Sequence, residues 1–185
     1  MNMNQQIKII AHRGFHVGDK ALENTFEAFQ RAIEVGCDYI ECDVLQTSDG
    51  ILICFHDKKY KDKSISEYSF EDLQRQLRSQ HTQLCTFERY LSLYTEIKLD
   101  IEIKESGYEN QVWSMLKEIP SERYVVKSFE IDVLKKLRVC SPNMVLGLLI
   151  HRRTWNKRES MIQLGCKILK KYLKSGNSKK TSDKF

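Results

Sequence analysis

The chain has 185 residues, of which 41% are hydrophobic and 30% are charged, and it contains only two prolines. This length and composition are typical of one soluble domain with a substantial core. The sequence has no apolar run of about 18 residues and therefore predicts no membrane span. Residues 1–6 lack the basic and apolar regions of a secretory signal peptide, so we expect a cytoplasmic protein.

The net charge of +5 is distributed unevenly along the chain. Residues 1–150 contain 19 basic and 23 acidic side chains, whereas residues 151–185 contain 11 basic and two acidic ones. We expect residues 166–185 to form a solvated Lys/Ser-rich tail, and the alternative is an arm that binds a polyanion. Because aromatic residues are sparse in this segment, we expect no nucleic-acid partner.

Apolar runs that predict strands alternate with segments that carry helix signals. In chain order the predicted elements are strand 7–11, a helix opened by Glu23-Asn24-Thr25 and ended by Gly36, strand 38–44, strand 51–55, a helix from Ser69, helix 86–94, strand 97–104, helix 108–119, strand 124–129, helix 131–139, strand 144–150 and helix 158–169. The polar segment 58–66 predicts a loop. This order predicts an α/β protein with a parallel sheet and helical crossovers.

The predicted fold departs from a full α/β barrel in the number of its strands and in one connection between strands. A full eight-stranded α/β barrel typically needs about 250 residues and has its active site at the carboxyl ends of the strands. Six strands are predicted here. Residues 45–50 join two of them without a helix and can span roughly 20 Å when extended, although a parallel crossover usually takes about a dozen residues or more.

Six cysteines lie at positions 37, 42, 54, 85, 140 and 166, and none of them forms a C-x-x-C pair. Cys42 and Cys54 lie inside predicted strands, where a thiol packs as a small apolar group. In a chain without an export signal, reduced cysteines are expected rather than disulfides or zinc ligands.

Three carboxylates lie near the ends of predicted strands. Glu41 and Asp43 are two positions apart on one strand and therefore share a face. Two such carboxylates repel each other unless a positive charge lies between them, and Mg²⁺ or Ca²⁺ prefers oxygen ligands. Glu102 can supply a third oxygen. The alternative is that these acids are solvated charges on an edge strand.

Two histidines, an arginine and a lysine also lie at the carboxyl ends of predicted strands. His12 and His56 each follow an apolar run, and imidazole transfers protons readily near neutral pH. Arg13 offers a planar fork for phosphate oxygens, and Lys104 adds a point charge. A lone histidine in such a place is more often a hydrogen-bonded core residue, but the joint occurrence favours metal-assisted cleavage of a phosphate ester.

These residues occur in motifs that resemble those of glycerophosphodiester phosphodiesterases. The resemblance is dense over residues 9–57 and recurs to about residue 165. The motifs are His12-Arg13-Gly14, Glu23-Asn24-Thr25 with Ala28-Phe29, Gly36-x-Asp38, Ile40-Glu41-x-Asp43-Val44, Thr47-x-Asp49-Gly50, His56-Asp57, Ile101-Glu102-Ile103-Lys104, Ser128-Phe129 and the segment from Pro142 to Leu149.

The resemblance implies a TIM-type (β/α) barrel over residues 1–165 and the hydrolysis of a glycerophosphodiester to glycerol 3-phosphate and an alcohol. It implies that a neighbouring glycerol hydroxyl attacks phosphorus and that water then opens a cyclic phosphate. The roles that it implies are general acid/base catalysis by His12 and His56, binding of a divalent metal, Mg²⁺ or Ca²⁺, by Glu41, Asp43 and Glu102, and phosphate binding by Arg13 and Lys104.

The chain departs from the family pattern in two places. The segment between His56 and Thr86 is short where the family usually carries a larger insertion, and segments like the family's last two strands are not found, so the barrel is expected to be incomplete, with about six of eight strands. A frameshift or a premature stop is one explanation of the tail. Open sheet edges would favour a homo-oligomer.

Three alternatives to an active phosphodiesterase stay open. The chain is either a catalytically impaired remnant that binds phosphate, a polyanion-binding protein that acts through its tail, or a related phospholipase of the same barrel superfamily. The last of these would need an apolar surface that faces lipid.

Overall fold

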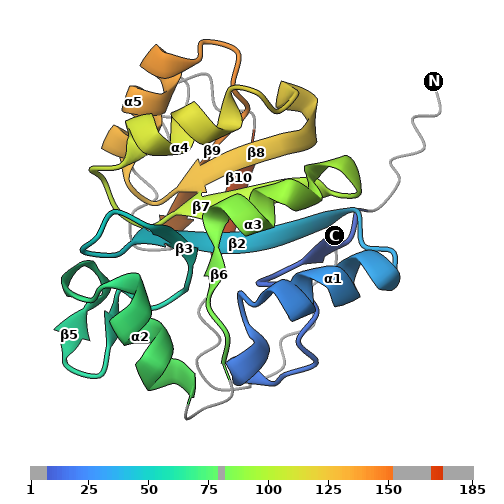
Figure 1. The fold of residues 1–185 in the computed structure, drawn as a ribbon. Coiled ribbons are helices and arrows are strands. Elements are labelled where there is room, and N and C mark those ends of the chain that lie inside the picture. The colour runs from blue at the N-terminus through green and yellow to red at the C-terminus, as the bar shows by residue number, and fades with distance from the viewer. Residues whose placement is uncertain (1–7, 79–81, 152–167, 173–185) are drawn as a thin grey trace.

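The computed structural model describes residues 8–78, 82–151 and 168–172. Six of the described strands run parallel in one curved sheet, and four of the five described α-helices pack on its outer face (Figure 1). The parallel strands are β1 (Ile10–Ala11), β2 (Tyr39–Gln46), β7 (Lys98–Ile103), β8 (Tyr124–Ser128), β9 (Leu146–His151) and β10 (Ile168–Tyr172). The helices are α1 (Phe26–Glu34), α2 (Phe70–Leu77), α3 (Phe87–Leu91), α4 (Glu109–Leu116) and α5 (Ile131–Cys140). The sequence-based expectation of a parallel, incomplete barrel is confirmed for the residues that the structure describes.

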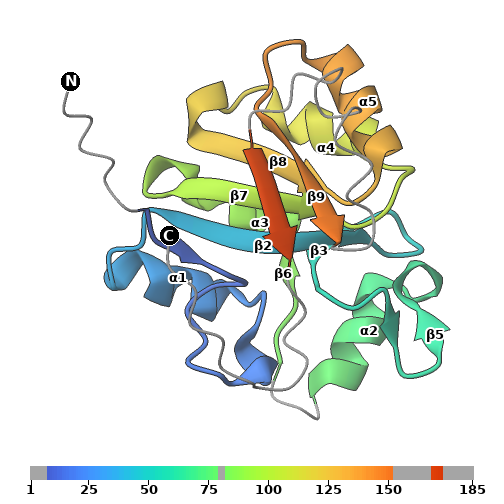
Figure 2. The same ribbon diagram turned by 180° about the vertical axis from the view of Figure 1, so that it is seen from behind.

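The long strand β2 lies at the centre of the sheet (Figure 1). Along one edge it pairs in parallel with β7, and the order continues through β8 and β9 to β10. Its other edge is shared, because residues 39–40 pair in parallel with β1, whereas residues 44–46 pair with β3 (Leu52–Cys54). Figure 2 shows β9 and β10 side by side at the far end of the sheet.

The expectation that strand 51–55 runs parallel to its neighbours is wrong. β3 is antiparallel to β2 and also to β6 (Cys85–Thr86), so residues 47–51 form a hairpin turn instead of a crossover. The six parallel strands therefore do not include β3. Their sixth member is β10, which falls in the segment that was expected to be a tail.

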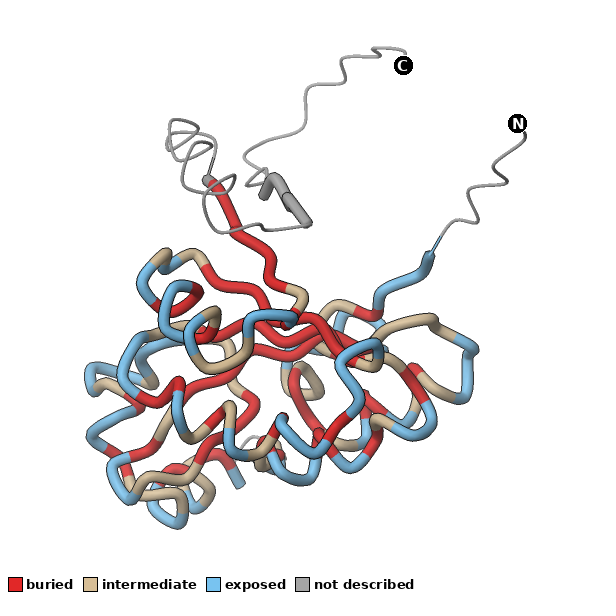
Figure 3. The backbone as a smooth tube through the Cα atoms, turned by 90° about the horizontal axis from the view of Figure 1, so that it is seen from above, coloured by how far each residue is buried: buried red, intermediate tan, exposed pale blue. Residues whose placement is uncertain are grey.

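The main core lies between the sheet and the helices. Along β2, Ile40, Cys42 and Val44 are fully buried in this core. The ring of Phe29 on α1 meets that of Tyr90 on α3 edge to face, with 4.8 Å between the ring centroids. The Tyr90 hydroxyl is buried and donates a 2.9 Å hydrogen bond to the carbonyl of Ile40. In Figure 3 the buried segments gather along the strands, and exposed segments lie around them.

A second, smaller core lies beneath the β2–β3 hairpin. Its buried members are Leu45, Ile53, Ile65, Tyr68, Leu73, Leu77 and Leu84. The segment 58–66, which the sequence predicted as a loop, contains a small hairpin of β4 (Lys59–Tyr60) and β5 (Lys63–Ser64). Asp49 in the β2–β3 turn accepts a hydrogen bond from the backbone N–H of Phe70 at 3.1 Å, which joins the turn to the start of α2.

Side-chain caps account for the starts of the two helices that the sequence marked most clearly. Thr25 accepts a hydrogen bond from the N–H of Ala28 at the start of α1, and Ser69 does the same for Asp72 at the start of α2. The predicted helix 158–169 lies outside the described residues up to residue 167, and its last two residues belong to β10 instead.

Two further expectations can be compared with the structure. Cys37, Cys42, Cys54, Cys85 and Cys140 are all free thiols, as expected, and Cys166 lies outside the described residues. Within the described parts of the chain, every helix is too short or too polar to cross a bilayer.

Candidate active site

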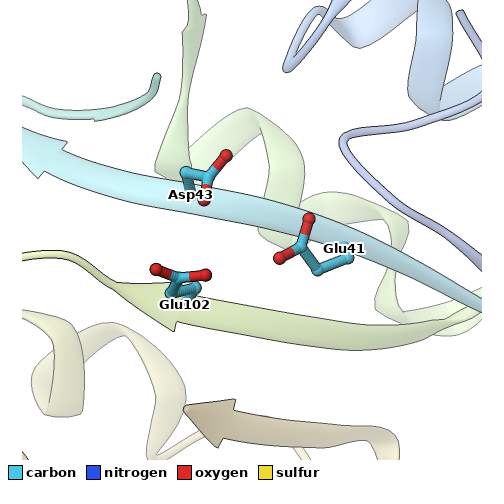
Figure 4. A group of neighbouring side chains, drawn as sticks. All are labelled: Glu41, Asp43 and Glu102. Atoms are coloured by element: carbon cyan, nitrogen blue, oxygen red, sulfur yellow. The ribbon is translucent and has the colours of Figure 1, made fainter. Parts of the chain in front are cut away.

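Alternation along two neighbouring strands places three carboxylates on the inner face of the sheet. Glu41 and Asp43 project from β2, and Glu102 projects from β7 directly opposite Asp43. One oxygen from each of the three lies within 4.8 Å of the others. Figure 4 shows the three carboxyl groups turned toward a common space between the two strands. The structure therefore brings the predicted metal ligands together.

Burial makes this carboxylate cluster a strong candidate for cation binding. Glu41 and Asp43 are 0% exposed and Glu102 is 3% exposed. Burial and then the charge of Asp43 raise the pKa of Glu41 to about 8. Glu41 Oε1 is buried and accepts no hydrogen bond from any residue that the structure describes. Hard divalent cations prefer oxygen ligands of this kind, so the residues present fit Mg²⁺ or Ca²⁺.

Arg13 is held over the carboxylates by the loop that follows β1. Its backbone N–H donates to Glu41 Oε2 at 3.1 Å, and its guanidinium lies 2.6 Å from Glu23 Oε2 and 3.2 Å from Asp43 Oδ2. Arg13 and Gly14 both have positive φ, 58° and 85°. This left-handed turn aims the guanidinium at the carboxylates.

Gly14 is required here for a second reason. A Cβ at this position would lie 2.7 Å from Cβ of Ala28 on α1, which is closer than van der Waals contact allows. The loop that carries Arg13 therefore packs directly on the backbone of α1, and the Gly14 N–H closes a turn on Ala11 O at 3.2 Å.

Asn24 is a site residue that the sequence indicated only as part of a helix-start motif. Its Nδ2 donates to Asp43 Oδ2 at 3.0 Å, and its Oδ1 accepts from the Asp43 backbone N–H at 3.1 Å. Asn24 is 2% exposed and has φ of 59°. These two hydrogen bonds fix the rotamer of Asp43. Asparagine adopts a positive φ more readily than most residues, so its presence at this position fits the backbone.

Lys104 lies against the carboxylate cluster from the end of β7. Its Nζ is 2.9 Å from Asp43 Oδ1 and 2.7 Å from Glu102 Oε1. Burial alone would raise the pKa of Asp43, but Lys104, Asn24 and Arg13 together hold it below its ordinary value. The two predicted phosphate-binding cations are thus both paired with the predicted metal ligands.

The two histidines lie at the rim of this arrangement. Nε2 of His12 is 3.9 Å from Glu41 Oε2. Nδ1 of His56 is 2.6 Å from Asp57 Oδ1. Although β3 is antiparallel, it delivers His56 to the same end of the sheet as Asp43, because the N–H of Phe55 donates to the carbonyl of Asp43 at 2.8 Å.

A pocket of about 360 Å³ opens beside the carboxylate cluster. It lies between the loop that follows β1 and the segment after β3. Its lining includes Arg13, Lys20, Glu23, His56 and Tyr60. A larger hollow of about 500 Å³ near α2 and α3 contains none of the predicted site residues. We therefore assign the smaller pocket to the site.

Two charged residues deeper in the sheet were not predicted from the sequence. Lys127 on β8 is 2% exposed, and its Nζ is 2.6 Å from Asp100 Oδ1 and 4.0 Å from Glu41 Oε1. The signal in the sequence was a single charge inside the apolar run Tyr124–Ser128.

The sequence model of the Glycerophosphoryl diester phosphodiesterase family matches residues 12–183, which include all seven predicted site residues. The chain belongs to this family. Two curated members named glycerophosphodiester phosphodiesterase are similar to it. The one from Caldanaerobacter subterraneus subsp. tengcongensis is 30% identical over 161 residues, which are 76% of this chain and 65% of that protein. The one from Bacillus altitudinis is 32% identical over 163 residues, which are 77% and 66%.

The chain spans about two thirds of the length of these two family members. A solved structure of a phosphodiesterase from Oleispira antarctica, in complex with the product sn-glycerol-3-phosphate, superposes with a TM-score of 0.74 at 22% identity and covers 89% of this chain and 74% of that one. This likeness shows that the described sheet has the family's barrel fold. The chemical roles of the seven residues remain predictions.

Proposed function

We propose that this member of the family hydrolyses glycerophosphodiesters to glycerol 3-phosphate and an alcohol, with the help of a divalent cation. The observation that supports this most is the convergence of the buried Glu41, Asp43 and Glu102 beside Arg13, Lys104 and the imidazole of His12, with His56 in the lining of the adjacent pocket. Solvated charges on an edge strand, the alternative, do not fit side chains that are at most 3% exposed.

Glu41, Asp43 and Glu102 would hold the cation, either Mg²⁺ or Ca²⁺. When bound, such a cation supplies positive charge that polarises a phosphoryl oxygen. Arg13 and Lys104 neutralise the carboxylates in the absence of a cation. Once those oxygens have another partner, the guanidinium and the ammonium are available for the phosphodiester.

His12 and His56 would transfer the protons. One imidazole accepts the proton of the attacking hydroxyl, and the other protonates the leaving alkoxide. Asp57 accepts a hydrogen bond from Nδ1–H of His56 in one tautomer, which leaves Nε2 free to face the substrate. The pocket beside His56 would receive one of the two groups esterified to phosphorus.

The test is an assay of the purified 185-residue chain with glycerophosphocholine and glycerophosphoethanolamine. We expect turnover that EDTA abolishes and that Mg²⁺ or Ca²⁺ restores. His12→Ala and Glu41→Ala should each lower the rate by about 100-fold or more. Glu88→Ala, which changes an exposed acid on α3, should leave the rate unchanged. Turnover without metal, or full activity in either site variant, would refute the assignment.

A second candidate, cleavage of a lysophospholipid headgroup, is favoured by one observation. Phe15 and Val17, in the loop that carries Arg13, are 40% and 76% exposed. Exposed apolar side chains beside a site are compatible with a lipid substrate. Assaying lysophosphatidylcholine beside glycerophosphocholine distinguishes the two candidate functions. If a Phe15→Ser/Val17→Ser variant loses turnover of lysophosphatidylcholine and keeps turnover of glycerophosphocholine, these apolar side chains bind a lipid substrate.

The remaining expectations stay predictions. They are a cytoplasmic location, a homo-oligomer formed through open sheet edges, and a division between a barrel domain of residues 1–165 and a tail of residues 166–185. The boundary at residue 165 lies outside the described residues. The size-exclusion volume of the purified chain tests the oligomer.

A further inference from the structure

A buried ion pair lies directly beneath the carboxylate cluster and has no part in the proposed chemistry. Lys127 and Asp100 are 2% and 3% exposed, and Lys127 Nζ lies 2.6 Å from Asp100 Oδ1. A lysine enclosed in this way loses its hydration, so the carboxylate beside it must compensate. The same Nζ lies 4.0 Å from Oε1 of Glu41, the oxygen that has no hydrogen-bond partner among the described residues.

The register of the sheet shows why Asp100 matters to the site. On β7, Asp100 is directly opposite Glu41, and Glu102 is directly opposite Asp43. The inner face of these two strands therefore carries four carboxylates, two from each strand. Within the described residues, the group whose oxygens approach one another closely enough for a shared ion contains only three of them. The fourth, Asp100, is engaged by Lys127.

We propose that Lys127 is a positioning residue that withholds Asp100 from the cation, so that the site offers three carboxylates instead of four. This inference rests on the proposed metal-dependent function. Mg²⁺ is usually held by one or two carboxylates and keeps waters and phosphate oxygens, whereas Ca²⁺ accepts more oxygen ligands. A fourth carboxylate would therefore bind the cation more tightly and would occupy a position that the substrate needs.

The contacts of Lys127 also predict the effect of removing either member of the ion pair. Without the ammonium, Asp100 is a buried carboxylate opposite Glu41, and a dication bound at Glu41 would supply positive charge close to it. Without the Asp100 carboxylate, the nearest acidic partner of the ammonium among the described residues is Glu41, at 4.0 Å, and the ammonium competes with a cation for Glu41. The two changes should thus alter cation affinity in opposite directions.

The experiment measures Ca²⁺ and Mg²⁺ binding to the full chain by calorimetry, after circular dichroism has shown that each variant is folded. Lys127→Met should bind Ca²⁺ at least 10-fold more tightly and should have a kcat at least 10-fold lower, with KM changed less. Asp100→Asn should bind Ca²⁺ at least 10-fold more weakly. The double variant, which replaces the ion pair by two neutral side chains, should return to within about threefold of the unaltered chain.

A merely structural ion pair gives a different result, because both single variants would then weaken cation binding. That outcome, or unchanged affinity in a folded Asp100→Asn, overturns the inference. If Lys127→Met does not fold, the comparison of Asp100→Asn with the double variant decides: recovery in the double variant supports the inference, and no recovery refutes it. If the unaltered chain binds neither cation, the proposed function itself fails.

The matched control is Lys135→Met. Lys135 also pairs with an aspartate, Asp132, at 3.2 Å, but on the exposed face of α5. Its replacement should leave cation affinity within twofold of the unaltered chain, which would show that the effect of Lys127 depends on its position and not on net charge.

Discussion

The side chain of Asn24 forms hydrogen bonds with both the side chain and the backbone of Asp43. Its amide N–H donates to the Asp43 carboxylate, and its carbonyl oxygen accepts from the Asp43 backbone N–H. Both groups are buried. The loop before α1 is thereby joined to the centre of β2.

Asn24→Ala should destabilise the chain by about 2 kcal/mol or more, because it leaves two buried partners unsatisfied and places alanine at positive φ. Urea unfolding measures the change. Asn143→Ala, at an exposed position, is the control and should alter stability by less than about 0.5 kcal/mol. Equal stability in the two variants would show that the Asn24 contacts contribute little.

The close contact between Gly14 and α1 leads to a second prediction. Gly14 and Gly18 have nearly the same φ, 85° and 82°, but of these two only Gly14 has atoms within 4 Å of the position that a Cβ would take. Alanine at either site carries the same left-handed backbone cost of about 1–2 kcal/mol. Gly14→Ala should therefore be the less stable variant and should also raise KM by displacing Arg13. Identical thermal midpoints would contradict this.

The hydrogen bond between His56 and Asp57 predicts an effect on proton transfer. Asp57→Asn replaces an acceptor by a group that can also donate to Nδ1, which favours the wrong tautomer of His56. Since Asp57 is largely exposed, the expected loss in kcat is moderate, about 10-fold, at the low end of acid/base effects. Asp62→Asn, at an exposed position in the same segment, is the control. A kcat and pH profile unchanged in Asp57→Asn would exclude this role.

The raised pKa of Glu41 predicts how the stability of the metal-free protein depends on pH. Burial and Asp43 raise this pKa from 4.5 to about 8, so between these values the folded chain binds a proton that the unfolded chain releases. The contribution of Glu41 to stability is thus fully present below pH 4.5 and is lost as the pH rises toward 8.

Urea unfolding in EDTA from pH 5 to pH 8 measures this dependence. Glu41→Gln, which cannot ionise, should show a flatter profile than the unaltered chain over this range. Parallel profiles would mean that the pKa of Glu41 is not raised. Excess Ca²⁺ should reduce the difference, because a bound cation stabilises the ionised carboxylate.

The sequence predicted five of the six parallel strands, missed β10 and misjudged the direction of β3, and the packing explains the error at β3. The apolar run from Ile51 to Phe55 is typical of a strand buried on both faces of a parallel sheet. It is buried on both faces because it lies between two cores: Leu52 and Cys54 pack in the main core, and Ile53 packs in the smaller one. The turn signal at Thr47–Gly50 was the better guide to a hairpin.

Some of the site residues could likewise be placed from the sequence, and others could not. Residues that share a strand, such as Glu41 and Asp43, could be placed from their spacing alone. Asn24 and Lys127 could not, because their contacts join elements that are distant in sequence, and a single polar residue in a motif or in an apolar run does not indicate its partner. Lys104 was predicted to face phosphate, but its contacts with Asp43 and Glu102 arise only once the strands are assembled.

The shared edge of β2 separates the part of the strand that anchors β1 from the part that anchors the hairpin leading to the pocket. Residues 39–40 bond to β1 and residues 44–46 bond to β3, so the chain between β3 and β6 can lengthen or shorten without moving β2 relative to β7. The three carboxylates lie on β2 and β7, whereas His56 and Tyr60, which line the pocket, follow β3. We therefore expect a change of length between β3 and β6 to reshape the pocket and to leave the carboxylate cluster in place.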